Sequence, residues 1–165
     1  MKTLLHTSPL LVLSLWVCLG GCSLESADRG ESAASHAPPR RIIATDEAPA
    51  AIGPYSQAVL VGDTLYCAGQ IGIDPATGQI VGGGIEAETR QALANLRAVL
   101  TSAGFSPADV VQAQVFLADL GDYAAMNAIY AELFADDPPA RAAVEVARLP
   151  RDARVEIMLV AVKSR

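Results

Sequence analysis

One carboxylate is conspicuous among the residues that could do chemistry, because it interrupts an apolar strand. Residues 154–162 read RVEIMLVAV, and in an extended chain Glu156 shares its face with three apolar side chains. An ionised carboxylate on an apolar face costs several kcal/mol unless it is paired. Glu156 is therefore either a functional group or the partner of a cation near the end of the strand, such as Arg154 or Lys163.

An arginine at the entry to another apolar segment is the second candidate. Arg141 follows Pro138 and Pro139 and precedes the run AAV. A guanidinium is planar, keeps its charge and matches both oxygens of a carboxylate. Arg141 therefore suits the binding of a small carboxylate; the alternatives are an exposed loop arginine and a structural salt bridge.

The remaining polar candidates are less specific. Asn127 falls on the inner side of a predicted helix, where it makes either a packing hydrogen bond or a ligand contact, and Tyr55 is either a packed ring or a pocket wall. The two histidines are His6 and His36, both ahead of the domain, so a Ser-His-Asp set is excluded there. Without histidines or paired cysteines, we expect no metal site.

Hydrophobic periodicity and turn residues predict the elements that position these candidates. Gly62 and Asp63 separate two short apolar runs, which is typical of a hairpin. Apolar residues at three- and four-residue spacing predict two helices, with Gly104 ending the first and Asp122 capping the second. The predicted inner face of the second helix is Tyr123, Met126, Ile129, Tyr130 and Leu133. The predicted strands are residues 57–61, 64–68, 70–73, 110–118, 142–147 and 154–162, and the helices are about 85–103 and 123–134.

This order predicts an α+β domain in which two helices cover one face of a mixed six-stranded sheet. The last strand is apolar on both of its alternating faces, which indicates burial on both sides. Because two helices cover only one side, we expect another subunit to hide the second face.

Composition limits the classes of function. The chain has 165 residues, 52% of them hydrophobic, and carries a formal net charge of −6. This length allows one domain, and the negative charge opposes binding to a phosphate backbone. We expect no nucleic-acid partner.

The N-terminus has the features of an export signal. Its apolar stretch, residues 10–20, is too short to span a bilayer and fits the core of a signal peptide. The sequence LGGC that ends at Cys22 resembles the lipobox of bacterial lipoproteins, in which the cysteine is acylated. We therefore expect a signal peptide at residues 1–21, a tether at 22–40 and the domain at 41–165. The expected location is the cell envelope, facing the periplasm, and Ser23 favours the outer membrane.

Five segments carry a resemblance to one family. They read EAPAAIGPYSQAV (47–59), AGQIGIDPATGQIV (68–81), RAVLTSAGF (97–105), VVQAQVFLADL (110–120) and PARAAVEVARLPRDARVEIMLVAV (139–162). Together they resemble the RidA/YjgF family of enamine/imine deaminases, over essentially all of residues 42–163.

The resemblance implies a chorismate-mutase-like (YjgF-type) fold, a homotrimer, and active sites in clefts between subunits. It implies hydrolysis of 2-iminopropanoate and 2-iminobutanoate to 2-keto acids and ammonia without a cofactor. By position, Arg141 would bind the substrate carboxylate and Glu156 would activate water. Tyr55, Gly69 and Asn127 would line or shape the pocket.

Two positions depart from the family pattern. Ala68 stands where serine is usual, and Ala143 stands where cysteine, threonine or serine is usual. The Ala143 carbonyl remains able to hold a water, so we expect impaired or shifted specificity. The alternatives to a deaminase are a carboxylate-binding trimer without turnover and, opposed by the charge, a ribonuclease or translation inhibitor.

Overall fold

The computed structural model describes residues 38–164. The predicted signal peptide, Cys22 and all but the end of the predicted tether lie outside the described residues. Within residues 38–164, no helix combines the length and the apolar character needed to cross a bilayer.

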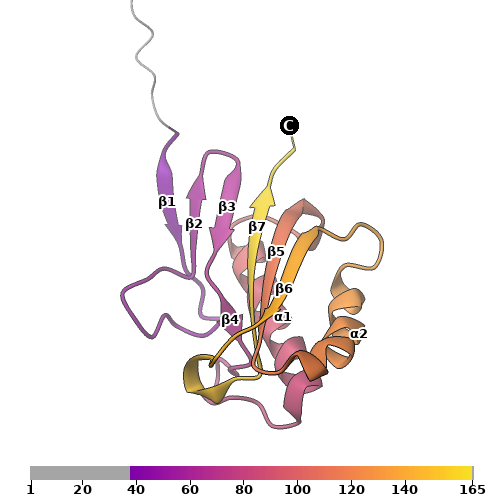
Figure 1. Ribbon diagram of the computed structural model, residues 1–165. Coiled ribbons are helices and arrows are strands. Elements are labelled where there is room, and N and C mark those ends of the chain that lie inside the picture. The colour runs from indigo at the N-terminus through magenta and orange to yellow at the C-terminus, as the bar shows by residue number, and fades with distance from the viewer. Residues whose placement is uncertain (1–37, 165) are drawn as a thin grey trace, which may run out of the picture. The chain divides into compact units, whose positions relative to one another are not determined.

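Seven strands form one mixed sheet, and Figure 1 shows them side by side. The neighbours along the sheet are β1-β2-β3-β7-β5-β6, and the two-residue strand β4 also pairs with β7. Among the strand pairs of residues 38–164, only β5–β6 is parallel. The strands are β1 (Arg40–Ile43), β2 (Ala58–Val61), β3 (Thr64–Cys67), β4 (Gln70–Ile71), β5 (Val110–Leu117), β6 (Ala140–Glu145) and β7 (Val155–Val162).

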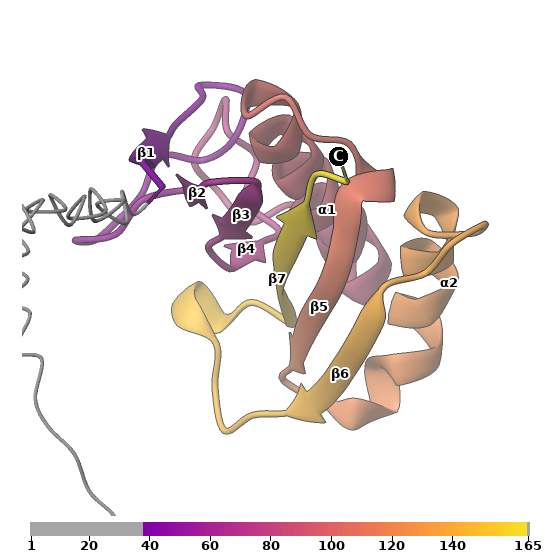
Figure 2. The same ribbon diagram turned by 90° about the horizontal axis from the view of Figure 1, so that it is seen from above.

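Two helices, α1 (Gly84–Ser102) and α2 (Tyr123–Leu133), cover one face of this sheet (Figure 2). The apolar stripe of α1 places Leu96, Val99 and Leu100 in the core, where they are fully buried. From the sheet, Ile157 and Leu159 of β7 enter the same core. The predicted α+β architecture with two helices on one face is confirmed.

Several predicted turns and ends are also confirmed. Gly62 adopts a left-handed φ of 58° in the β2–β3 hairpin, as its place in the turn requires. Gly104, with φ 83°, ends α1, and the N–H of Phe105 donates to the carbonyl of Leu100.

Three details differ from the sequence prediction. The sheet gains β1, because Arg40–Ile43 pairs with β2. Asp122 stands at the N-cap of α2 without capping it, since its carboxylate accepts hydrogen bonds from Arg154 instead. Tyr123, assigned to the inner face of α2, is 40% exposed.

The second face of the sheet, opposite the helices, carries exposed apolar side chains from edge to edge. Residues there include Ile42, Tyr66 and Val144, which are 48%, 52% and 46% exposed in the single chain. In β7 the side chains alternate between fully buried and half-buried. The half-buried set, which includes Glu156, belongs to this second face.

Three short 3₁₀ turns complete the domain, and one of them bears on the site. Turn η3 (Pro150–Asp152) follows β6 and lies on the side of the sheet away from the helices (Figure 2). Leu149 and Ala153, which flank it, pack with Ile71 and Ile73 in a small second core. The segment thereby covers one end of the second face.

Candidate active site

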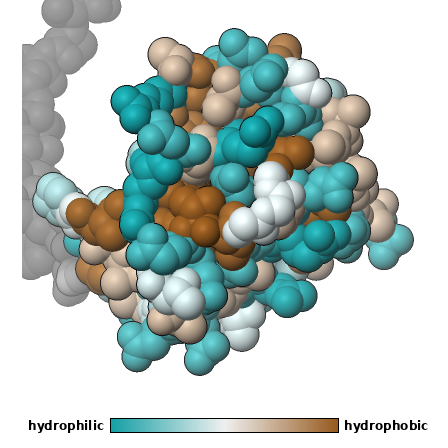
Figure 3. Space-filling model, turned by 90° about the horizontal axis from the view of Figure 1, so that it is seen from below, coloured by the Kyte–Doolittle hydropathy of each residue, from teal (hydrophilic) through white to brown (hydrophobic). Residues whose placement is uncertain are grey.

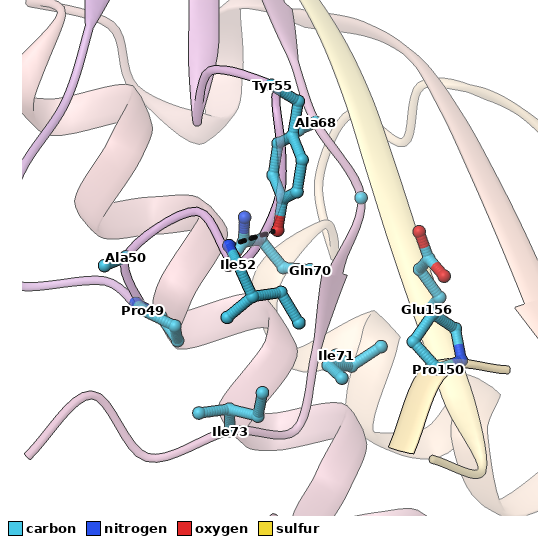
Figure 4. A pocket seen from close by; sticks show the side chains of 11 residues that line it. Pro49, Ala50, Ile52, Tyr55, Ala68, Gln70, Ile71, Ile73, Pro150 and Glu156 are labelled. Carbon is cyan, nitrogen blue, oxygen red and sulfur yellow. Dashed lines mark hydrogen bonds between the residues drawn. The ribbon is translucent and has the colours of Figure 1, made fainter. Parts of the chain in front are cut away.

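A cavity of about 300 Å³ opens between β4, the β1–β2 connection and η3. Its walls are mainly apolar. Figure 3 views the domain from the end where β4 and η3 lie, and shows a group of apolar side chains there with hydrophilic side chains around it. Figure 4 shows the lining residues Pro49, Ala50, Ile52, Tyr55, Ala68, Gln70, Ile71, Ile73, Pro150 and Glu156; Gly69 completes the set. We call this cavity the carboxylate pocket, after Glu156.

Glu156 reaches the carboxylate pocket from the second face of β7 (Figure 4). Within residues 38–164 its carboxylate has no hydrogen bond and no ion pair. The alternative of a structural pair is wrong, because Arg154 binds Asp122 and Lys163 binds Asp109. Burial raises the pKa of Glu156 above its ordinary value.

Gly69 makes room for this carboxylate. A Cβ at position 69 would overlap Oε1 of Glu156 and lie 2.8 Å from its carboxyl carbon. Because Gly69 has no side chain, the carboxylate packs directly against the backbone between β3 and β4.

Tyr55 and the loop that carries it form the opposite wall of the carboxylate pocket. The N–H of Ile52 donates to the Tyr55 hydroxyl at 3.4 Å (Figure 4). Buried Gln57 fixes the start of this loop: its amide nitrogen donates to the carbonyls of Thr45, Ala48 and Pro49. A buried amide with all of these partners makes the loop a defined wall.

Arg141 lies elsewhere, on the edge strand β6. It is paired in register with Ala113 of β5, which faces the helices, so Arg141 also faces them. Its guanidinium carbon lies 4.5 Å from the ring centroid of Tyr130, and no carboxylate of residues 38–164 forms an ion pair with it. The alternative of a structural salt bridge is therefore wrong.

Asn127 and Arg141 line the same shallow cavity, which we call the arginine pocket. The remaining lining residues are Tyr130, Ala131, Phe134, Ala135, Pro138 and Pro139. Ala143 lies two residues beyond Arg141 on the same face of β6, half-buried against the core. The arginine pocket thus combines a cation and an amide without any acid.

One chain therefore carries two separate pockets, which we call half-sites because each lacks the charge that the other holds. Glu156, Tyr55 and Gly69 meet in the carboxylate pocket, whose lining contains no cation. Arg141 and Asn127 meet in the arginine pocket on the other face of the sheet. The structure does not bring Arg141 and Glu156 together within one chain.

The described residues offer neither a reactive cysteine nor a cluster of metal-ligating side chains. Cys67 is buried, and burial raises the pKa of its thiol to about 12, which leaves it protonated and a poor nucleophile. Within residues 38–164, no three His, Cys, Asp or Glu side chains gather where they could hold a metal ion.

Two features of the half-sites were not predicted from the sequence. Tyr123 and Tyr130 contact Arg141, although the helical periodicity marked both as core residues. The spacing of Tyr123, Asn127 and Tyr130 at i, i+4 and i+7 places them on one helix face, and that signal was available. Pro150 enters the carboxylate pocket through the turn η3, which has no periodic signature.

Comparison with known proteins identifies the family of this chain. Residues 45–163 match the family described as Endoribonuclease L-PSP. The 2-iminobutanoate/2-iminopropanoate deaminases of goat and human are 54% and 51% identical over 124 residues, which is 75% of this chain and 90% of theirs. The chain belongs to the Endoribonuclease L-PSP, or RidA/YjgF, family.

Solved structures of RidA/YjgF proteins share the fold. The YjgF gene product of E. coli has a TM-score of 0.72 at 43% identity, and the match covers 75% of this chain and 99% of that one. E. coli TdcF with bound serine has a TM-score of 0.73 at 40% identity, with the same coverage of both chains. The expected family and YjgF-type fold are therefore confirmed for the domain.

Proposed function

We propose that this RidA/YjgF protein hydrolyses 2-imino acids, including 2-iminopropanoate and 2-iminobutanoate, to 2-keto acids and ammonia. The observation that carries the proposal is that Arg141 and Glu156 each lie in a pocket of their own without an ion-pair partner. A 2-imino acid presents a carboxylate for the arginine and an electrophilic carbon for a water held by the glutamate. The names of the goat and human relatives support the same substrates.

The sites are completed between copies of the chain in a homotrimer. Arg141 on the edge strand β6 and Asn127 on α2 of one copy lie beside the carboxylate pocket of the next. Two observations support this assembly: each half-site lacks what the other supplies, and the second face of the sheet is apolar. An apolar face of this kind is stabilised when another subunit covers it.

In such a site the reaction needs orientation and proton transfer. Arg141 binds the substrate carboxylate through two parallel hydrogen bonds, and the imine carbon then faces Glu156. Glu156 takes a proton from water as the oxygen bonds to the imine carbon. The imine nitrogen gains one proton from Glu156 and a second from the hydroxyl group of the tetrahedral intermediate. The C–N bond then breaks, and ammonia leaves as the carbonyl forms. The raised pKa of Glu156 makes it a better base near neutral pH than an ordinary carboxylate.

Trapping of the imine tests this proposal. An amino-acid oxidase generates 2-iminopropanoate, and semicarbazide captures the imine that is not hydrolysed. We expect the wild-type domain, residues 40–165, to lower the semicarbazone yield and Arg141→Ala to leave it unchanged. Equal yields with both proteins across a series of imino acids would contradict the deaminase.

A binder without turnover is the second candidate. The apolar side chains of Ala68, in the wall of the carboxylate pocket, and Ala143, next to Arg141 on its face of β6, favour it, because neither offers a hydroxyl to hold a water. Saturable binding of 2-keto acids by calorimetry, with no effect on the semicarbazone yield, would identify this function. Cys67 contributes no nucleophile to either function.

We also propose that the chain is anchored in the cell envelope through acylated Cys22, with the domain facing the periplasm and the outer membrane preferred. The sequence LGGC and the short apolar stretch before it support the anchor. Metabolic labelling with palmitate should mark the wild-type chain and not Cys22→Ala. A labelled Cys22→Ala chain, or an unlabelled wild-type chain, would contradict the anchor.

A further inference from the structure

The Arg141 guanidinium is held by aromatic rings instead of by a carboxylate. Its carbon lies 4.5 Å from the ring centroid of Tyr130 and 5.8 Å from that of Tyr123. Its Nη2 donates a hydrogen bond of 3.3 Å to the Tyr123 hydroxyl. Cations are attracted to the faces of aromatic rings, so these contacts orient the guanidinium without neutralising its charge.

Three other arginines of the described residues are held by carboxylates instead of by aromatic rings. Arg90, Arg148 and Arg154 each form an ion pair with a carboxylate. An arginine that already binds a carboxylate has fewer donors for a substrate. Arg141 keeps its fork of donors, and the aromatic contacts replace the restraint that an ion pair would give.

Both tyrosines are themselves fixed. Tyr130 is 5% exposed and stacks on Phe134 with ring centroids 4.7 Å apart. Tyr123 begins α2 directly after Asp122, whose carboxylate accepts hydrogen bonds of 3.0 and 2.7 Å from Arg154. The start of α2 is thereby tied to the start of β7.

The Tyr123 hydroxyl joins Arg141 to Asn127. A hydrogen bond with Asn127, followed by the charge of Arg141 and its hydrogen bond, lowers the pKa of Tyr123. Asn127 lies four residues after Tyr123 on the same face of α2. The phenol therefore links the two polar groups of the arginine pocket.

We propose that Tyr123 is a positioning residue: its hydroxyl fixes the rotation of the Arg141 guanidinium and so prepares it to bind the substrate carboxylate in two-pronged geometry. This inference rests on the proposed function, because it gives Arg141 a carboxylate to bind. Arginine loses much rotational freedom when it binds a ligand, and a guanidinium that is already oriented loses less.

Tyr123→Phe tests the inference, because it keeps the ring and removes only the hydroxyl. With 40% of Tyr123 exposed, the variant should fold, and thermal unfolding checks this. We expect the Kd for 2-oxobutanoate, measured by calorimetry on the wild-type assembly and the variant, to rise about five- to tenfold. KM for the imino acid should rise by a similar factor while kcat stays within about twofold of wild type. Thr101→Val, which removes an exposed hydroxyl from α1 on the helix side of the sheet, is the control and should leave both unchanged.

A double-mutant cycle separates action through Arg141 from a direct contact. If Tyr123 acts through the guanidinium, Tyr123→Phe weakens 2-oxobutanoate binding in the wild-type background and has no further effect in Arg141→Ala. Two results would overturn this inference alone. In one, Tyr123→Phe raises the Kd by the same factor with and without Arg141; in the other, Tyr123→Phe leaves the Kd unchanged although Arg141→Ala raises it. Unchanged binding in Arg141→Ala, or no binding to wild type, overturns the proposed function and this inference with it.

Discussion

At the scale of single residues, the site depends on a carboxylate that has been left without a partner. Glu156 lies half-buried in an apolar pocket, while Arg154 and Lys163, the cations that flank its strand, are paired with other acids. A free, partly desolvated carboxylate is costly for stability and useful for proton transfer. The proposed activity gives a reason for that cost.

Gly69→Ala tests whether the position of this carboxylate matters. The added methyl would overlap the Glu156 carboxylate, whose flexible end must move. We expect kcat for imino-acid hydrolysis to fall at least about tenfold, since misplacement of a catalytic base is costly, with little change in the thermal midpoint. Gly82→Ala is the matched control, because a Cβ there meets no atom within 4 Å. Equal activity in both variants would show that the carboxylate need not lie against the backbone.

The pH dependence of stability tests the environment of Glu156. A carboxyl whose pKa is raised on folding binds its proton more tightly in the folded state, so its contribution to stability is lost as pH rises from the ordinary glutamate pKa through the raised one. Glu156→Gln removes this loss. We therefore expect the variant to gain thermal stability relative to wild type as pH rises from about 4 to 7. A constant difference between the two proteins over this range would mean that the pKa of Glu156 is not raised.

At the scale of elements, buried polar side chains fix the walls of the carboxylate pocket. Asn95 of α1 is 1% exposed, and its amide nitrogen donates to the carbonyls of Ile71 and Ile73 at 3.2 and 2.9 Å. These bonds hold β4 and the residues after it, which line the pocket. The strand itself is only two residues long, so it depends on this support.

Asn95→Ala should therefore lower both stability and activity. The buried Ile73 carbonyl loses its amide donor, and the Ile71 carbonyl loses one donor and keeps the N–H of Ile73, at a cost of about 2–4 kcal/mol in the free energy of unfolding. Urea denaturation measures this loss. Gln91→Ala, which removes one half-buried donor to Asn95, is the control and should cost under about 1 kcal/mol. A loss in Asn95→Ala no larger than in the control would contradict the bracing role.

How much the sequence predicts also differs between elements. Periodicity and turn residues were enough for both helices and the β2–β3 hairpin, because these depend on local contacts. The face on which Arg141 lies depends on the register of the parallel β5–β6 pair, which joins segments far apart in the chain. The aromatic contacts of Arg141 likewise join segments far apart in the chain. Turn η3 has no local signature either, because Arg151 and Asp152 adopt positive φ without being glycine. Glu156 was identifiable from sequence because its charge conflicts with the strand pattern.

At the scale of the whole molecule, the proposed site depends on the second face of the sheet. The proposed trimer buries this face and brings the two half-sites together. Val160→Lys places a charge in the middle of the face, opposite Tyr66 and Gln112. We expect the variant to be a monomer by light scattering and inactive, although Arg141 and Glu156 are both present.

Thr101→Lys serves as the control for this change. Thr101 is exposed on α1, on the side of the sheet covered by the helices. The control should keep the assembly and the activity of wild type. A monomeric Val160→Lys protein with full activity would mean that a single chain contains the whole site.

Complementation between two inactive variants measures the shared site most directly. Arg141→Ala and Glu156→Gln chains are unfolded together in equal amounts, refolded, and assayed for imine hydrolysis beside each variant refolded alone. In a mixed trimer, an intact Arg141 from one chain can meet an intact Glu156 from another, so random assembly should restore about a quarter of wild-type activity. A mixture that stays at the level of the separate variants, while refolded wild type is active, would contradict a site shared between subunits.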